Sequence, residues 1–359
     1  MGAGDASTDG LTAGLRAAVG RATGRRPRRP AMVTGRPRDV ARAVVGAALR
    51  VALRCSDRKV GVALLYHGVG GPARPEKSIL VPSVPFEDFA AHVRHLCRRY
   101  RLVAASELQA AAAERRRGQR LPVAITFDDD DAGYVGSVLP VLTREAARAA
   151  FLLNGASLDR PRWFWWERLQ AAWDRGLVDE DLIARLPLPA GPSPLTSDWA
   201  LRALGEGLYA LPPSAIARVQ AVLADRLGED PPTARMGSEQ VRRLVDAGHE
   251  IGFHTREHPF LPVLDDAELA RSLSEGREAL ERLAGAPLTT FAYPSGGSDA
   301  RFVEAVRRAG YPAAFTTRKA PVTPGSDPLA LGRIVPQPGA AAALSLELGR
   351  TLVGRPRPS

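Results

Sequence analysis

The sequence predicts an α/β fold: a parallel sheet or barrel of about eight short strands, interrupted once by a helical insertion. Short apolar segments alternate with longer amphipathic ones along most of the 359 residues. Residues 159–236 break this alternation and contain all five tryptophans. Four consecutive aspartates follow one predicted strand directly, a position where barrel proteins hold polar functional groups.

The excess positive charge lies at the start of the chain. Residues 1–60 contain 13 Lys/Arg and 4 Asp/Glu, a net of +9 out of a total of +10. Residues 1–37 are rich in Gly, Ala, Pro and Arg without a periodic apolar face, so we predict a disordered basic arm. No nucleic-acid-binding motif accompanies the charge, and we expect no nucleic-acid partner.

A basic amphipathic helix is expected within residues 38–60. Its arginines recur four or eight residues apart, at Arg38, Arg42, Arg50 and Arg54. Such a helix either packs against its own domain or lies on an anionic membrane surface, which makes residues 38–59 a candidate for peripheral contact with the inner face of a membrane. The apolar run 43–49 is too short to span a bilayer and lies too deep in the chain for a usual signal peptide.

The two cysteines, Cys55 and Cys97, cannot form a disulfide framework. Reduced thiols are the simpler interpretation, and we therefore expect a cytoplasmic protein. The sequence does not predict an oligomeric state.

Eight segments are short, rich in strand-forming residues and bounded by Pro, Gly or polar residues. These predicted strands are 61–66, 101–104, 123–127, 149–153, 250–253, 289–293, 313–316 and 331–335. The helices predicted between them are 86–99, 106–117, 138–147, 238–247, 265–283 and 299–309. Ser238 is a suitable N-cap and Gly248 a suitable C-cap of one helix. The barrel would span residues 61–336, followed by a C-terminal helix and tail over 337–359.

The insertion over residues 159–236 follows the carboxyl end of a predicted strand, so we expect it at the mouth of the barrel. A Pro-rich break at 187–194 divides it. Its tryptophans are Trp163, Trp165, Trp166, Trp173 and Trp199. They would form a small core of their own or offer aromatic faces to sugar rings.

The run Asp128-Asp129-Asp130-Asp131 needs a counter-charge if it is buried, because like charges repel and resist desolvation. A solvated acidic turn and a bound cation are both consistent with the run alone. His254 and His258 follow a later strand at spacing i, i+4, so both imidazoles can reach one ion. One carboxylate and two imidazoles leave coordination positions open, and the second aspartate can take a proton from water.

Several motifs, in the same order along the chain, resemble those of polysaccharide deacetylases of the NodB-homology type. They are residues 126–129 (TFDD), 248–258 (GHEIGFHTREH) and 291–296 (FAYPSG). Residues 64–67 (LLYH), 313–317 (AAFTT) and 331–334 (LGRI) resemble the subgroup that opens with a YH strand. The resemblance covers about residues 60–158 and 237–336 and implies a distorted (β/α) barrel of about seven to eight strands.

The resemblance implies a metal-dependent deacetylase that removes N-acetyl groups from a glycan or glycan precursor by means of metal-activated water. Asp128 would be the general base, and Asp129, His254 and His258 would bind the metal, usually zinc. The substrate and its oxyanion would lie against Ser295, whose backbone N–H donates, and against the adjacent Tyr293 and Pro294.

The chain departs from the family pattern at three points. Asp130 replaces the usual glycine, which adds a negative charge beside the metal. The third motif lacks the arginine that holds the base in many members, and Arg333 is a candidate substitute. No histidine follows His258, so the general acid implied by the YH subgroup is His67.

Two alternatives stay open at this point. The same site could remove O-acetyl esters from carbohydrate, or the domain could bind glycans without catalysis.

Overall fold

The computed structural model describes residues 37–70, 78–81, 83–156, 158, 162–188, 197–230 and 235–354. Residues 1–38 and 39–359 form separate units, and the second contains all the described strands. The arm predicted over residues 1–37 lies outside the described residues, except for its last residue. Among the described helices, none combines the length and apolar character that a membrane span requires.

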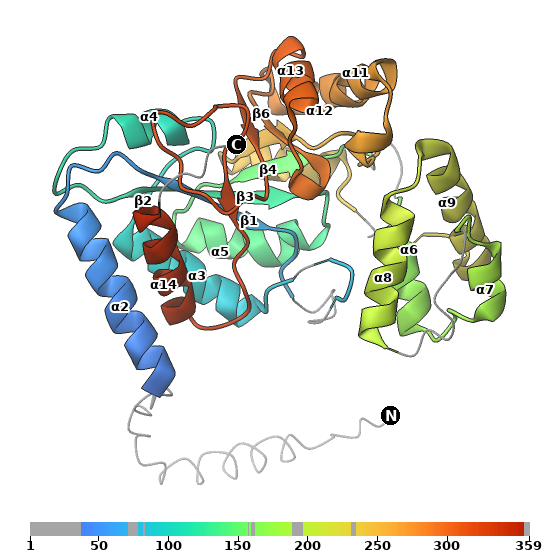
Figure 1. The fold of residues 1–359 in the computed structure, drawn as a ribbon, viewed down its shortest axis with the longest axis horizontal. Coiled ribbons are helices and arrows are strands. Elements are labelled where there is room, and N and C mark those ends of the chain that lie inside the picture. The colour runs from blue at the N-terminus through green and yellow to red at the C-terminus, as the bar shows by residue number, and fades with distance from the viewer. Residues whose placement is uncertain are drawn as a thin grey trace, which may run out of the picture. The chain divides into compact units, whose positions relative to one another are not determined.

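A parallel sheet, nearly closed into a barrel, forms the centre of the second unit (Figure 1). Its strands in the described residues are β1 Val62–Tyr66, β2 Arg101–Leu102, β3 Pro122–Asp128, β4 Ala150–Leu153, β5 Glu250–Phe253, β6 Thr290–Ala292, β7 Ala313–Phe315 and β8 Arg333–Ile334. Their order is β7-β6-β5-β4-β3-β1-β8, with β2 paired to the start of β3. The Leu331 N–H donates to Ala314 and its carbonyl accepts from Thr316, which brings β8 towards β7. The predicted barrel class is confirmed.

The central strands are buried on both faces, which explains why their sequences are continuously apolar rather than alternating. Tyr66 of β1, Phe127 of β3 and Phe151 of β4 stand in register. Their rings stack with centroids 5.5 and 4.8 Å apart. This aromatic row aligns the three strands, so the polar residues that follow each strand emerge at the same edge.

Helices surround the sheet. They are α2 Pro37–Arg54, α3 Phe86–Arg99, α4 Leu108–Ala113, α5 Leu139–Arg144, α10 Ser238–Asp246, α11 Asp266–Ser274, α12 Arg277–Ala284, α13 Ala300–Arg308 and α14 Ala341–Val353. A π-helical turn, Tyr134–Val138, precedes α5.

Two helix predictions need correction. The single helix predicted over 265–283 is two helices, because Gly276 adopts a left-handed conformation with φ +84° and ends the helical path. Ser238 does not cap α10: Gly237 occupies the N-cap position, and the Ser238 hydroxyl donates to the carbonyl of Leu158.

The insertion consists of α6 Trp165–Asp174, α7 Glu180–Arg185, α8 Asp198–Tyr209 and α9 Pro213–Leu227, which group together in Figure 1. These helices share a hydrophobic cluster separate from the barrel core. Trp165 and Trp166 are buried in it and Trp173 packs against it, whereas Trp199 is 75% exposed. Trp165, Trp166 and Trp173 therefore contribute to the hydrophobic core of the insertion.

The helix α2 packs along α14 (Figure 1). A Cβ on Gly46 would lie 2.7 Å from the backbone of Ser345, and one on Gly349 would lie 3.0 Å from Leu49, so the glycines permit close approach. The opposite face of α2 leaves Val40, Val44 and Val51 more than half exposed.

Candidate active site

The carboxyl ends of four neighbouring strands bring polar residues to one edge of the barrel. His67 follows β1, Asp128 ends β3, Asn154 follows β4, and His254 follows β5. Because these strands are parallel and adjacent, the residues after them converge although the chain separates them widely.

Asp129, His254 and His258 could together hold a metal ion. One potential ligand atom from each lies within 4.8 Å of the others. The Nδ1–H of His254 donates to the Ala292 carbonyl at 2.8 Å, which leaves Nε2 free, 4.0 Å from Asp129 Oδ1. Asp129 Oδ1 and His258 Nδ1 are buried and have no hydrogen-bond partner in the described residues. Two imidazoles and a carboxylate, with buried ligand atoms on Asp129 and His258 that lack a hydrogen-bond partner, fit a divalent ion such as zinc.

The backbone of this site is strained. Four of the five non-glycine residues with positive φ in the described chain lie here: Asp129 (69°), Thr255 (60°), His258 (47°) and Ser295 (53°). Each such conformation costs on the order of 1–3 kcal/mol and persists where the surroundings enforce it, as they do at functional sites. The turn at Asp129 points the two adjacent carboxylates towards different neighbours, Arg333 for Asp128 and the two histidines for Asp129.

Asp128 forms a bidentate, fully buried salt bridge with Arg333. The two N–H···O distances are 2.6 and 2.7 Å, and neither residue is more than 1% exposed. Burial alone would raise the pKa of Asp128, but the Arg333 guanidinium and His254 outweigh it and lower the pKa below its ordinary value. Asp128 is therefore held ionised, 3.8 Å from His254 Nε2.

His67 lines the same cavity as Asp129, His258 and Ser295. Its Nδ1 is buried and without a hydrogen-bond partner in the described chain. Burial lowers the pKa of His67, while Asp128 and Asp129 act in the opposite direction. The Tyr134 hydroxyl lies 2.5 Å from the carbonyl oxygen of Asp128 and 3.0 Å from that of His67, so it ties the two strand ends together.

Of the three residues expected around the oxyanion, only Ser295 lines this cavity. Its hydroxyl lies 2.7 Å from the Tyr209 hydroxyl, which the insertion supplies. The Tyr293 hydroxyl donates to the Leu329 carbonyl at 2.8 Å, and its ring is buried in the barrel core. Pro294 is also buried. The side chain of Tyr293 is thus occupied in packing.

Asn154 is a site residue that the sequence interpretation missed. Its Nδ2 donates to the carbonyls of His254 at 3.1 Å and Thr255 at 2.8 Å. Its backbone N–H donates to Asp130 Oδ1 at 2.8 Å. Asn154 therefore links the acidic run to the loop that begins at His254. Its position directly after a predicted strand could have indicated this role.

Arg235, at the end of the insertion, is the second residue missed. Its guanidinium bonds Glu167 at 2.8 Å and lies 4.0 Å from the centre of the Phe164 ring. Arg235 pairs with Asp131 in a β-bridge, so the chain returning from the insertion lies along the acidic run.

Asp130 has an ordinary negative φ, so the backbone does not require glycine there. Burial raises the pKa of Asp130 to about 6, opposed by the nearby charge of Arg235. Arg235 from the insertion therefore offsets only part of the cost of burying this additional carboxylate.

The cavity at these residues has a volume of about 420 Å³. Barrel loops supply one side of it, and the insertion supplies the other through α6 and α8. The insertion side of the cavity is aromatic, lined by Trp165, Trp166 and Tyr209. Two charged residues of α8, Arg202 and Glu206, also line it. The insertion therefore shapes the access to the candidate metal ligands.

Comparisons with known proteins agree with this fold. The family model for polysaccharide deacetylase matches residues 214–314, which include His254, His258 and Ser295. The Streptococcus pyogenes deacetylase PplD, solved in complex with acetate, has a TM-score of 0.54 at 15% identity, covering 80% of this chain and 98% of that one. IcaB from Ammonifex degensii has a TM-score of 0.51 at 17% identity, with coverage of 81% and 97%.

A de-N-acetylase from Aggregatibacter actinomycetemcomitans is similar to the same degree, with a TM-score of 0.52 at 15% identity over 80% of this chain and 99% of its own. At such identities the structural likeness supports the fold alone. The fold and the family-model match both agree with the resemblance to polysaccharide deacetylases that the sequence motifs predict. The resemblance to this family is thus confirmed, and the YH subgroup stays a prediction.

Proposed function

We propose that the protein hydrolyses N-acetyl groups of a glycan or glycan precursor and depends on a divalent metal ion, most simply zinc. One observation carries the proposal: potential ligand atoms of Asp129, His254 and His258 meet at one strand edge, beside a carboxylate that Arg333 holds ionised. The atoms of Asp129 and His258 are buried and have no hydrogen-bond partner in the described residues. Polysaccharide deacetylases act on carbohydrate, and the aromatic cavity wall suits a sugar ring.

The residues of the chain divide the proton transfers between them. A zinc ion, when bound, would polarise the amide carbonyl and lower the pKa of the attacking water. Asp128 accepts the proton of that water, and Arg333 fixes the orientation of its carboxylate. The backbone N–H of Ser295 donates to the oxygen that becomes negative.

His67 donates a proton to the departing nitrogen, because an amide anion is too poor a leaving group at neutral pH. The C–O bond forms as water adds, and the C–N bond then breaks. The products are acetate and a free amine on the sugar.

Acetate release from defined oligosaccharides, with metal content measured in the same samples, tests this function. We expect acetate from N-acetylated substrates. Release from O-acetylated substrates alone would establish the carbohydrate esterase instead. No release from either substrate by fully metal-loaded protein would contradict an enzyme and favour a glycan-binding domain.

We also propose that α2 contacts an anionic membrane surface. Val40, Val44 and Val51 are 55%, 62% and 55% exposed on the face away from α14, and the first 60 residues carry a net charge of +9 (13 − 4). The full-length protein should sediment with phosphatidylglycerol vesicles but not with phosphatidylcholine vesicles. Val44→Glu should abolish sedimentation, and equal binding to both vesicle types, or to neither, would contradict the proposal.

A cytoplasmic location stays part of the proposal, on the ground that Cys55 and Cys97 are both free thiols. Cell fractionation tests it.

A further inference from the structure

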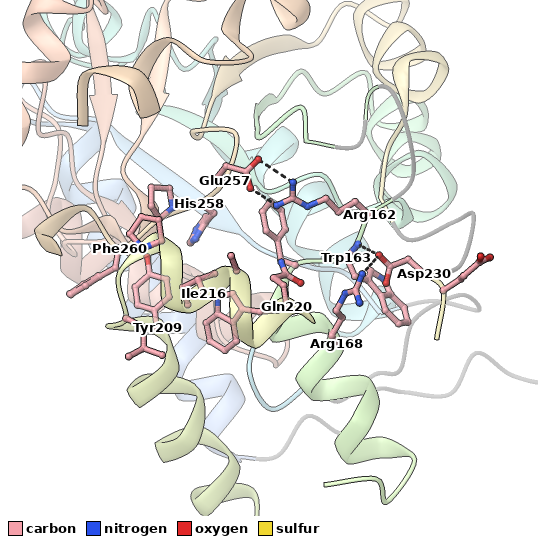
Figure 2. A pocket seen from close by; sticks show the side chains of 17 residues that line it. Arg162, Trp163, Arg168, Tyr209, Ile216, Gln220, Asp230, Glu257, His258 and Phe260 are labelled. Atoms are coloured by element: carbon pink, nitrogen blue, oxygen red, sulfur yellow. Dashed lines mark hydrogen bonds and ion pairs between the residues drawn. The ribbon is translucent and has the colours of Figure 1, made fainter. Parts of the chain in front are cut away.

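A second cavity, of about 730 Å³, lies between the insertion and the loop that follows β5 (Figure 2). We name it the insertion pocket. The residues that line both this pocket and the cavity at the candidate metal ligands are Trp165, Tyr209, His258 and Phe260. The two cavities therefore adjoin. The volume falls within the range of about 300–1,000 Å³ that is typical of small-molecule sites.

Two side chains in the insertion pocket have polar atoms without partners. Arg168 Nη2 donates to Asp230 at 2.6 Å, but its Nε and Nη1 are buried and bond to nothing in the described part of the chain (Figure 2). Gln220 Oε1 on α9 is buried and without a partner there as well. Because burying a polar atom without a hydrogen-bond partner destabilises the protein, these atoms mark a place where ligand or water binds.

The chemistry of the pocket favours a neutral ligand rich in hydroxyl groups. Hydroxyl groups can both accept from Arg168 and donate to Gln220, whereas a carboxylate can only accept and an ammonium group can only donate. Among the described residues, the lining contains three carboxylates, Glu229, Asp230 and Glu257, and two arginines, Arg162 and Arg168. The formal charge of this described lining is −1, which disfavours an anion. The aromatic rings of the wall offer flat surfaces against which the apolar face of a sugar ring can pack (Figure 2).

We propose that the insertion pocket binds a neutral sugar ring neighbouring the acetylated one, so that the enzyme selects a chain of at least two sugars. This inference rests on the proposed function, because the acetylated ring must sit in the adjoining cavity. It assigns Arg168 and Gln220 a role in specificity and gives the insertion a function beyond its own core.

Kinetics on N-acetylglucosamine and its trisaccharide test the inference with two variants. Arg168→Lys retains a positive charge for Asp230 but lacks the unpartnered Nε–H and Nη1–H groups, and Gln220→Leu removes the acceptor. We expect the ratio of kcat/KM for the trisaccharide to that for the monosaccharide to fall about 5- to 10-fold in each variant, as the loss of a hydrogen bond implies. Arg185→Lys is the matched control. Arg185 lies in the same insertion and pairs with Asp225 at 2.6 Å, the same distance as in the Arg168–Asp230 pair, but it does not line the pocket.

An unchanged ratio in both variants, or an equal fall in the Arg185→Lys control, would overturn the inference. If the wild type releases no acetate from any substrate, the proposed function fails. A separate measurement of trisaccharide binding then tests whether the pocket binds sugar. Tryptophan fluorescence titrated with the trisaccharide would then support the pocket if wild type binds and Arg168→Lys and Gln220→Leu do not. Equal binding by all proteins, or no binding by wild type, would refute it.

Discussion

At the scale of single residues, two adjacent aspartates have different surroundings and, in our account, different tasks. Asp128 ends β3 in extended conformation and meets Arg333, whereas Asp129 turns to a φ of 69° and faces the histidines. Burial raises the pKa of Asp129, but His258 and His254 outweigh it and bring the pKa to about 2. Both carboxylates are therefore ionised at neutral pH, one as a candidate base and the other as a candidate ligand.

Replacing Arg333 by methionine should destabilise the protein by about 3–5 kcal/mol, because it leaves the Asp128 carboxylate buried without its partner. Urea unfolding measures this cost. The double variant Asp128→Asn/Arg333→Met should be more stable than the sum of the two single changes predicts. Arg185→Met, which breaks an exposed pair with Asp225, should cost at most about 1 kcal/mol. A comparably small cost at Arg333, with additive single changes, would contradict the assigned pairing.

His67→Ala should retain fold and metal but lose amide hydrolysis by about 10²–10⁴-fold, as expected when a general acid is removed. Hydrolysis of p-nitrophenyl acetate should be affected far less, since its leaving group needs no proton. Steady-state assays on both substrates separate the two effects. Equal losses on amide and aryl ester would assign His67 to binding or structure, and near-wild-type amide turnover would remove it from the mechanism.

At the scale of elements, the strands explain how much the sequence could predict. The strand segments were predictable because buried parallel strands are continuously apolar, and β5 matches its predicted range of 250–253. The break between α11 and α12 could not be predicted, because the amphipathic pattern is regular on both sides of Gly276. That pattern does not reveal the positive φ of Gly276. The role of His249, just before β5, could not be predicted either, because its ring packs on Phe151 of a neighbouring strand.

Stability should fall as pH drops from about 6.5 towards 4, with His249 contributing. Burial, and secondarily the charge of Arg148, lower the pKa of His249 from 6.5 to about 4. The unfolded state therefore binds the proton first, and the contribution at pH 5 is at most about 2 kcal/mol. Urea unfolding of metal-free protein at pH 7 and pH 5 measures the effect, and His249→Asn should reduce it. The same pH difference in both proteins would show that another group is responsible.

At the scale of the whole second unit, the insertion completes the site that the barrel begins. Tyr209 bonds Ser295, and Arg235 returns along the acidic run beside Asp131. The motif residues at the strand ends could be predicted because parallel strands share one carboxyl edge. Arg235 and Tyr209 could not, since their places depend on how the insertion folds back, and no local sequence pattern specifies that path.

Glycan binding should slow hydrogen exchange in the insertion, because α6 and α8 line the cavity at the candidate metal ligands. Exchange measured by mass spectrometry, with and without saturating N-acetylated trisaccharide, should show protection in Trp165–Asp174 and in Asp198–Tyr209. Helix α13, Ala300–Arg308, contributes no residue to the lining of that cavity and serves as the internal control. Unchanged exchange across the insertion would assign it a remote structural role.

Metal content measured alongside acetate release distinguishes the proposed metal ligands from the proposed base. Wild-type protein should contain about one divalent ion per chain, and Asp129→Ala, His254→Ala and His258→Ala should lose metal and activity together. Asp128→Asn should keep the metal while turnover falls about 10²–10⁴-fold, because it removes a base and not a ligand. Full metal occupancy in the two histidine variants, or loss of metal from Asp128→Asn, would contradict the account.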